Sequence, residues 1–109
     1  RDFIHVDDVC SAVLSLIEGE WKAVDYHAFN VATQTKVSLL ELIDAINKVL
    51  VEKNQHYAPI VPVFGLSREG DIQDSLADIQ RMKTTFNWNP TMDFQRGLEL
   101  MIHSRMENR

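Results

Sequence analysis

Three stretches of the chain carry apolar residues at helical spacing. The first, running from Asp7 or Asp8 to about residue 18, is apolar nearly all round. The stretches 38–53 and 93–106 each carry a single apolar stripe. A helix that is apolar on most sides is normally buried on most sides, whereas one stripe is typical of a surface helix. The first helix is therefore expected to need more covering than 109 residues supply.

Several residues predict where these helices begin and end. Asp7 or Asp8 is expected to cap the first helix, because a short acidic side chain accepts from free N–H groups at the positive end. Gly19 is expected to stop it. Ser38 and Glu41 have the S-x-x-E spacing of a capping box and predict the start of the second helix.

Short extended segments and one further helix are predicted between these stretches. Residues 2–6 alternate as a strand does, and 27–32 form a second strand. Residues 58–64 contain two prolines, which favour an edge strand or an irregular segment. Asp78 is expected to cap a short helix over 79–86. Strands alternating with helices favour an α/β fold.

Composition and charge exclude several classes of protein. The 109 residues suffice for one small domain, and the net charge of −5 argues against a general nucleic-acid binder. A single cysteine excludes an intrachain disulfide and fits a reducing compartment. No apolar run approaches the ~20 residues of a membrane span, and no signal peptide is apparent, so a cytoplasmic segment is expected. The four histidines are scattered, and no metal site is expected.

Two arginines stand out by their context. Arg1 precedes the first predicted strand, and Arg68 lies in a polar loop where Gly70 permits close backbone approach. An arginine fork fits phosphate oxygens bidentately, and Asp71 is suited to accept hydrogen bonds from sugar hydroxyls. From spacing alone, a solvated salt bridge in the loop is the commoner arrangement.

Other polar residues have ordinary structural interpretations. Cys10 is expected to be a small, inert core residue. His5 is expected to be a core histidine bonded to a nearby carboxylate or backbone group. Trp88, in Asn87-Trp88-Asn89-Pro90, is expected in a packed turn, and Asn30 is expected to bond backbone in a turn.

Four motifs, in this order, resemble the C-terminal third of the extended short-chain dehydrogenase/reductases, especially the nucleotide-sugar 4-epimerases. They are R-D-F-I-H-V-D-D-V at 1–9, F-N-V-A at 29–32 with V-S-L-L-E-L-I at 37–43, R-E-G-D at 68–71 with S-L-A-D at 75–78, and F-N-W-N-P at 86–90 with G-L at 97–98. Each motif is weak alone, but the set covers nearly the whole chain. The resemblance implies the C-terminal part of an α/β enzyme, with short strands alternating with helices and the N-terminal Rossmann lobe missing.

The resemblance also implies a binding role for four residues. Arg1 and Arg68 would bind the diphosphate of a UDP-sugar, Asp71 would bind the ribose hydroxyls, and Phe3 would pack close to the nucleotide. Ala32 stands where the family usually has glycine, which is a mild departure.

Family chemistry uses a tightly held NAD, a glycine-rich NAD turn and a Tyr-x-x-x-Lys pair. Neither motif occurs here, since Tyr26 and Tyr57 are followed four positions later by Asn30 and Val61. No catalytic, cofactor-binding or metal-binding residue is therefore expected in this portion, and it is expected to be inactive and not to bind NAD alone.

The resemblance predicts that 1–109 is a substrate-binding portion in which 1–18 and 75–86 pack on the missing cofactor lobe. An isolated chain is then expected to expose an apolar patch or to bury it by self-association. Three alternatives remain open: the same portion of a dehydratase or decarboxylase, a stand-alone nucleotide-binding module, and a structural interaction domain that would hold the two arginines far apart.

Overall fold

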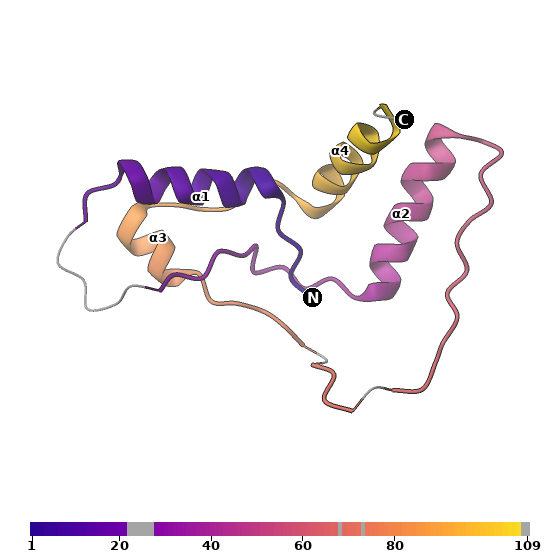
Figure 1. Ribbon diagram of the computed structural model, residues 1–109, viewed down its shortest axis with the longest axis horizontal. Coiled ribbons are helices and arrows are strands. Elements are labelled where there is room, and N and C mark those ends of the chain that lie inside the picture. Colours follow the sequence, from indigo (N-terminus) through magenta and orange to yellow (C-terminus); the bar gives the residue numbers. More distant parts are fainter. Residues whose placement is uncertain (22–27, 68, 73, 108–109) are drawn as a thin grey trace.

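The fold consists of two helical pairs joined by long extended segments (Figure 1). The computed structural model describes residues 1–21, 28–67, 69–72 and 74–107. Within these ranges the helices are α1 (Val6–Glu18), α2 (Leu39–Lys53), α3 (Gln80–Phe86) and α4 (Phe94–Glu107). Helix α1 packs on α3, and α2 packs on α4. The helices predicted over 38–53, 79–86 and 93–106 are thus confirmed to within a residue or two.

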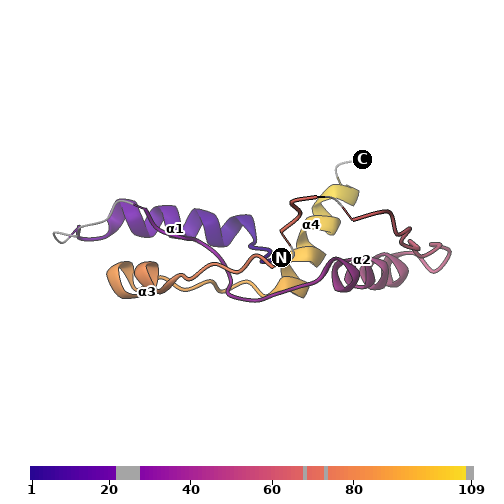
Figure 2. The ribbon, with the colours of Figure 1, turned by 90° about the horizontal axis from the view of Figure 1, so that it is seen from below.

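The molecule is flat and open for its length. Its principal extents are 56 × 38 × 20 Å, and its radius of gyration is 17.5 Å. A compact domain of this size has a radius of gyration of about 13 Å. Figure 2, seen from below, shows how thin the molecule is and how far the two helical pairs are separated. A chain this open leaves more apolar surface exposed than a compact one.

The predicted alternation of strands and helices is not confirmed. The described residues contain no β-strand, and residues 2–5 and 28–32 are extended without a sheet. Residue 27 of the second predicted strand lies outside the described residues. Arg1 and Val37 do exchange both backbone hydrogen bonds, at 2.7 and 2.8 Å, as one antiparallel pair would. A strand needs a neighbouring strand for its ladder, and none is present among the described segments.

The start of α1 differs from the prediction. The helix is capped by His5, whose Nδ1 accepts from the Asp7 backbone N–H at 3.2 Å. Asp7 and Asp8 therefore lie inside the first turn and neither is the cap. The predicted bond between His5 and a nearby backbone group is confirmed, but the side chain is 17% exposed and partly buried rather than in the core. Gly19 follows the last helical residue as predicted.

The other helix termini follow the sequence closely. At α2, the Ser38 Oγ accepts from Glu41 N at 3.1 Å, and the Glu41 carboxylate accepts from Ser38 N at 2.7 Å, which confirms the capping box. At α3 the cap residue is Ile79 and not the predicted Asp78, whose carboxylate lies one position earlier and accepts from Gln80 N at 2.8 Å. That helix ends at Asn87 in the left-handed conformation, with φ of 51°.

The core lies between α1, α3 and the segments that cross them. Trp88 is 4% exposed, and its indole N–H donates to the Ser11 hydroxyl of α1 at 2.8 Å, which confirms the packed turn. The Asn30 side chain donates to the Asp78 carbonyl at 3.0 Å, so it bonds backbone as expected, although across 48 positions. The buried cluster consists of Ala12, Ala32, Ile79, Met82 and Trp88.

Asp8 is a buried carboxylate that joins the two halves of the molecule. It is 2% exposed, and it accepts from Thr91 N at 2.9 Å, Thr91 Oγ1 at 3.1 Å and Met92 N at 3.0 Å. Burying a carboxylate is costly unless donors satisfy it, and three donors do so here. Helix α1 is thereby fixed to the segment that leads into α4.

The outer face of α1 is apolar and uncovered by the described residues. Val6, Val13, Leu14 and Ile17 are between 48% and 73% exposed. Cys10 is also exposed, so the expectation of a core cysteine is wrong for this chain. It lies on a face that nothing in the described structure covers. No helix among the described residues is long and apolar enough to cross a membrane.

Candidate functional site

Arg1 and Asp71 lie in direct contact although 70 positions separate them. The Arg1 Nη2 donates to Asp71 Oδ1 at 3.0 Å, and Nη1 donates to the Ile72 carbonyl. Both side chains face solvent, with 36% and 65% of their surface exposed. Two of the predicted binding residues are therefore neighbours, which the linear sequence does not reveal.

The backbone around Arg1 is held on both sides. The reciprocal hydrogen bonds to Val37 fix its main chain. The next residue, Asp2, accepts from Thr33 N at 2.9 Å, Thr33 Oγ1 at 2.6 Å and Gln34 N at 2.9 Å. Gln34 has φ of 59°, so the Asp2 carboxylate also supports a turn that few residues adopt. The sequence motifs did not single out Asp2 as a supporting residue, although it directly follows Arg1.

A second ion pair lies beside the first. The Lys36 ammonium contacts the Asp74 carboxylate. Its hydrogen bond and its positive charge lower the pKa of Asp74 below the usual range for an aspartate. No local sequence pattern predicts this pair, because Lys36 lies before α2 and Asp74 lies in the loop after it.

The conformation of Gly70 shapes the loop before Asp71. Gly70 has φ of +79°, a region that glycine adopts without the cost that a Cβ imposes. The chain can thus turn sharply one residue before the carboxylate that meets Arg1. Arg68, the other predicted arginine, lies outside the described residues, and its role stays a prediction.

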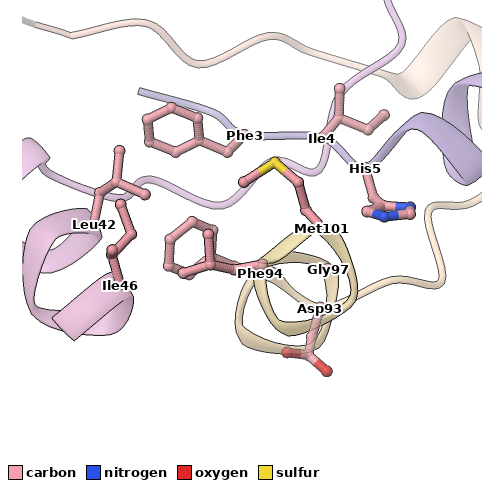
Figure 3. Close-up of a pocket in the computed structure, with 10 residues that line it drawn as sticks. Phe3, Ile4, His5, Leu42, Ile46, Asp93, Phe94, Gly97 and Met101 are labelled. Carbon is pink, nitrogen blue, oxygen red and sulfur yellow. The ribbon is translucent and has the colours of Figure 1, made fainter. Parts of the chain in front are cut away.

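Phe3 lies on a cavity between α2 and α4 rather than against the Arg1 guanidinium. The cavity has a volume of about 290 Å³ and is almost entirely apolar. The Phe3 and Phe94 ring centroids are 5.8 Å apart, and Figure 3 shows both rings beside Leu42 and Ile46. Phe3 lies two residues along the chain from Arg1, and its contact with a nucleotide stays a prediction.

The four glycines do not form a cradle for NAD. A Cβ at Gly19 would lie 2.6 Å from the Phe86 ring, and one at Gly97 would lie 3.1 Å from His5, so both glycines serve close packing. Gly65 and Gly70 lie singly in open loop. A dinucleotide turn needs clustered glycines at the start of a helix. The residues present do not fit NAD, and no group of metal-ligating side chains occurs among the described residues.

The contact between Arg1 and Asp71 leaves binding capacity on both groups. A guanidinium has five N–H donors, and Arg1 uses two of them on described residues. The Asp71 Oδ2 accepts no hydrogen bond from the described part of the chain. The site can therefore offer donors to a phosphate and, next to them, an acceptor to a hydroxyl.

Comparison with known proteins defines the class. A family described as GDP-mannose 4,6 dehydratase matches residues 1–101, and the chain belongs to this family. The resemblance inferred from the motifs is thereby confirmed.

Particular relatives are nucleotide-sugar enzymes by name. The chain is 28% identical to CDP-abequose synthase of Salmonella typhimurium, over 94% of this chain and 33% of that protein. It is 32% identical to UDP-glucose 4-epimerase of Bacillus subtilis, over 93% of this chain and 27% of that protein. The chain thus spans about a third or less of the length of these relatives.

A solved structure shares the fold. MoeE5 in complex with UDP-glucuronic acid and NAD superposes with a TM-score of 0.74 and 22% identity, over all of this chain and 34% of that one. This likeness shows that the open arrangement of helices is also the fold of a portion of that protein.

Proposed function

We propose that this chain is the nucleotide-diphosphate-sugar binding portion of an NAD-dependent nucleotide-sugar 4-epimerase. The observation that carries the proposal is the contact between Arg1 and Asp71, which joins two family motifs at one exposed site. The relatives named UDP-glucose 4-epimerase and UDP-glucuronate 4-epimerase support this reaction class.

In this proposal each site residue has one role. Arg1 and Arg68 bind the diphosphate through bidentate hydrogen bonds. Asp71 accepts from the ribose hydroxyls, and Phe3 packs near the nucleotide without donating a hydrogen bond. A nucleoside diphosphate carries its ribose next to its phosphates, so donors and an acceptor in contact suit that pair of groups.

The chemical step requires groups that these 109 residues do not contain. When NAD is bound to such an enzyme, it exchanges a hydride with the sugar. The chain's own residues here bind and orient the nucleotide only. We therefore propose that the chain alone is inactive and does not bind NAD.

A dehydratase is the second candidate. The family description, GDP-mannose 4,6 dehydratase, favours it. Both candidates use the same diphosphate contacts, so the proposed roles of Arg1 and Asp71 do not depend on the choice.

The exposed face of α1 supports the proposed packing of 1–18 and 75–86 on a cofactor lobe. In the described structure α3 covers one side of α1 and leaves Val13 and Ile17 uncovered, 48% and 73% exposed. A soluble protein rarely leaves such a contiguous apolar face without a partner. In the chain alone, we propose, this face drives self-association.

Titration of UDP into the 109-residue chain, followed by amide NMR, tests the binding role. UDP is expected to shift the resonances of Phe3 and of Gly70 to Ile72, and Arg1→Ala is expected to weaken binding at least about tenfold, since charged hydrogen bonds contribute ~1.5–3 kcal/mol. Arg96→Ala is the matched control, because Arg96 is exposed on α4 and pairs only locally with Glu99. Unchanged spectra at millimolar UDP would contradict the proposal.

A further inference from the structure

The chain between α2 and α3 is long and is held by few points of attachment. Residues 54–79 contain no helix or strand within their described part. The Asn47 side chain fixes one end by exchanging two hydrogen bonds with the Ile60 backbone, at 2.7 and 2.9 Å. The Asn30 side chain holds the other end at the Asp78 carbonyl. Between Ile60 and Asp78, the polar contacts that the described residues make with the rest of the molecule are those of Arg1 and Lys36.

Apolar burial holds only the end of this segment, where Ala77 and Ile79 pack in the core, and it does not position the part around Asp71. Val63 is 95% exposed, Leu66 is 99% exposed and Ile72 is 65% exposed. Side chains that stay in water contribute almost nothing to holding a loop. The place of Asp71 therefore depends on the polar contacts on either side of it.

The two cations that hold the loop, Arg1 and Lys36, lie on neighbouring backbone segments that are hydrogen-bonded to each other. Lys36 directly precedes Val37, which is paired with the Arg1 backbone, and it follows the Thr33–Gln34 turn that Asp2 holds. Their partners, Asp71 and Asp74, are three residues apart in the loop. Two attachments at separate points fix the orientation of a segment, whereas one attachment leaves it free to rotate.

We propose that Lys36 and Asp74 form a positioning ion pair that keeps Asp71 beside Arg1 and so prepares the site for a nucleoside diphosphate. This inference rests on the proposed function. Lys36 acts through Asp74 and does not touch the ligand. The lowered pKa of Asp74 is consistent with a pair that is fully charged at neutral pH.

One rival role for Lys36 is a direct contact with phosphate. The two roles predict opposite effects for Asp74→Lys. If Lys36 bound phosphate, a further positive charge nearby would tighten UDP binding. If the ion pair positions the loop, the same substitution repels Lys36 and weakens binding.

The test compares Lys36→Glu, Asp74→Lys and the double charge swap in the whole 109-residue chain. Each single substitution is expected to weaken UDP binding about two- to fivefold, which is the scale of an exposed ion pair. The double swap is expected to restore most of the lost affinity. Lys36→Arg should bind as the unsubstituted chain does. Lys48→Glu, on an exposed position of α2, is the control for net charge and should change little.

A ligand-free measurement separates this inference from the proposed function. Without UDP, both single substitutions should shift the amide resonances of Gly70 and Ile72 and increase their fast motion, and the swap should reverse this. Unchanged loop resonances, or tighter UDP binding by Asp74→Lys, would overturn the positioning role. If UDP leaves the unsubstituted chain unaffected while the loop resonances respond, the proposed binding function fails and the ion pair is shown to hold the loop only.

Discussion

The two halves of the molecule differ in how their helices are covered. Helices α1 and α3 enclose a core in which Ala12 and Met82 are fully buried, yet the opposite face of α1 is apolar and exposed. Helices α2 and α4 bury only Val49, Gly97 and Leu98, and they leave an apolar cavity of about 290 Å³ between them. The first half has a well-packed interior and an uncovered exterior; the second has an incompletely filled interior.

This difference indicates which half has more apolar surface left uncovered by the described residues. A helix with two apolar faces is stable only when both are covered, whereas an amphipathic pair is stable with one. In the proposed packing on a cofactor lobe, the α1–α3 half would therefore gain more from an outside surface than the α2–α4 half would. The same α1 carries Asp8, through which the two halves are joined.

Loss of the Asp8 carboxylate is expected to give the largest effect. Asp8→Ala leaves the Thr91 and Met92 backbone N–H groups without their acceptor in a buried place. We expect a loss of about 3 kcal/mol in the free energy of unfolding, measured by urea denaturation. If the midpoint does not change, the two halves are not joined through this carboxylate.

Asp7→Ala is the matched control for that substitution. The Asp7 side chain is 70% exposed, and its contact is a 3.5 Å approach to His5. Its loss is expected to change the free energy of unfolding by less than about 0.5 kcal/mol. A similar loss in both variants would point to helix charge rather than to the buried hydrogen bonds.

The structural features that depend on local sequence signals could be predicted. The apolar stripes placed the helices, and the Ser38–Glu41 spacing gave a capping box that the structure confirms. The strands were not confirmed, because a strand requires a partner strand and the pattern of 2–6 says nothing about whether one is present. The predicted cap of α1 was wrong because the Asp8 carboxylate accepts its hydrogen bond from Thr91, 83 positions away.

The candidate site also contains residues that local motifs identified and residues that depend on long-range contacts. Motifs singled out Arg1 and Asp71 separately, and only the fold brings them into contact. Asp2 and Lys36 escaped notice, since their partners Thr33 and Asp74 are distant in sequence and carry no motif. Long-range polar contacts are set by the path of the chain, which no periodicity reveals.

The uncovered face of α1 is expected to control association with little effect on stability. Val13→Gln with Ile17→Gln should lower the apparent mass in light scattering and reduce dye binding, because it removes apolar surface that is already in water. The free energy of unfolding should change by less than about 0.5 kcal/mol. Leu39→Gln with Leu40→Gln, equally exposed on α2, should leave the mass as it is. A chain that is monomeric and binds no dye before any substitution would refute association through α1.

The smallest expected effect is the pH dependence of the α2 cap. Hydrogen bonds from the Ser38 backbone and hydroxyl lower the pKa of Glu41 below its ordinary 4.5. A carboxyl whose pKa is lowered in the folded state stabilises the fold above its ordinary pKa, and this contribution is lost as the pH falls through the lowered value.

Glu41→Gln keeps the geometry but removes the charge, so the variant should lose less stability than the unsubstituted chain between pH 5 and about pH 3. Urea midpoints across this range measure the difference, with Glu52→Gln in the last turn of α2 as the control. Since Asp74 titrates in the same direction in both chains, its contribution cancels. Parallel midpoint curves would mean that the charge of Glu41 adds nothing to the hydrogen bonds of the capping box.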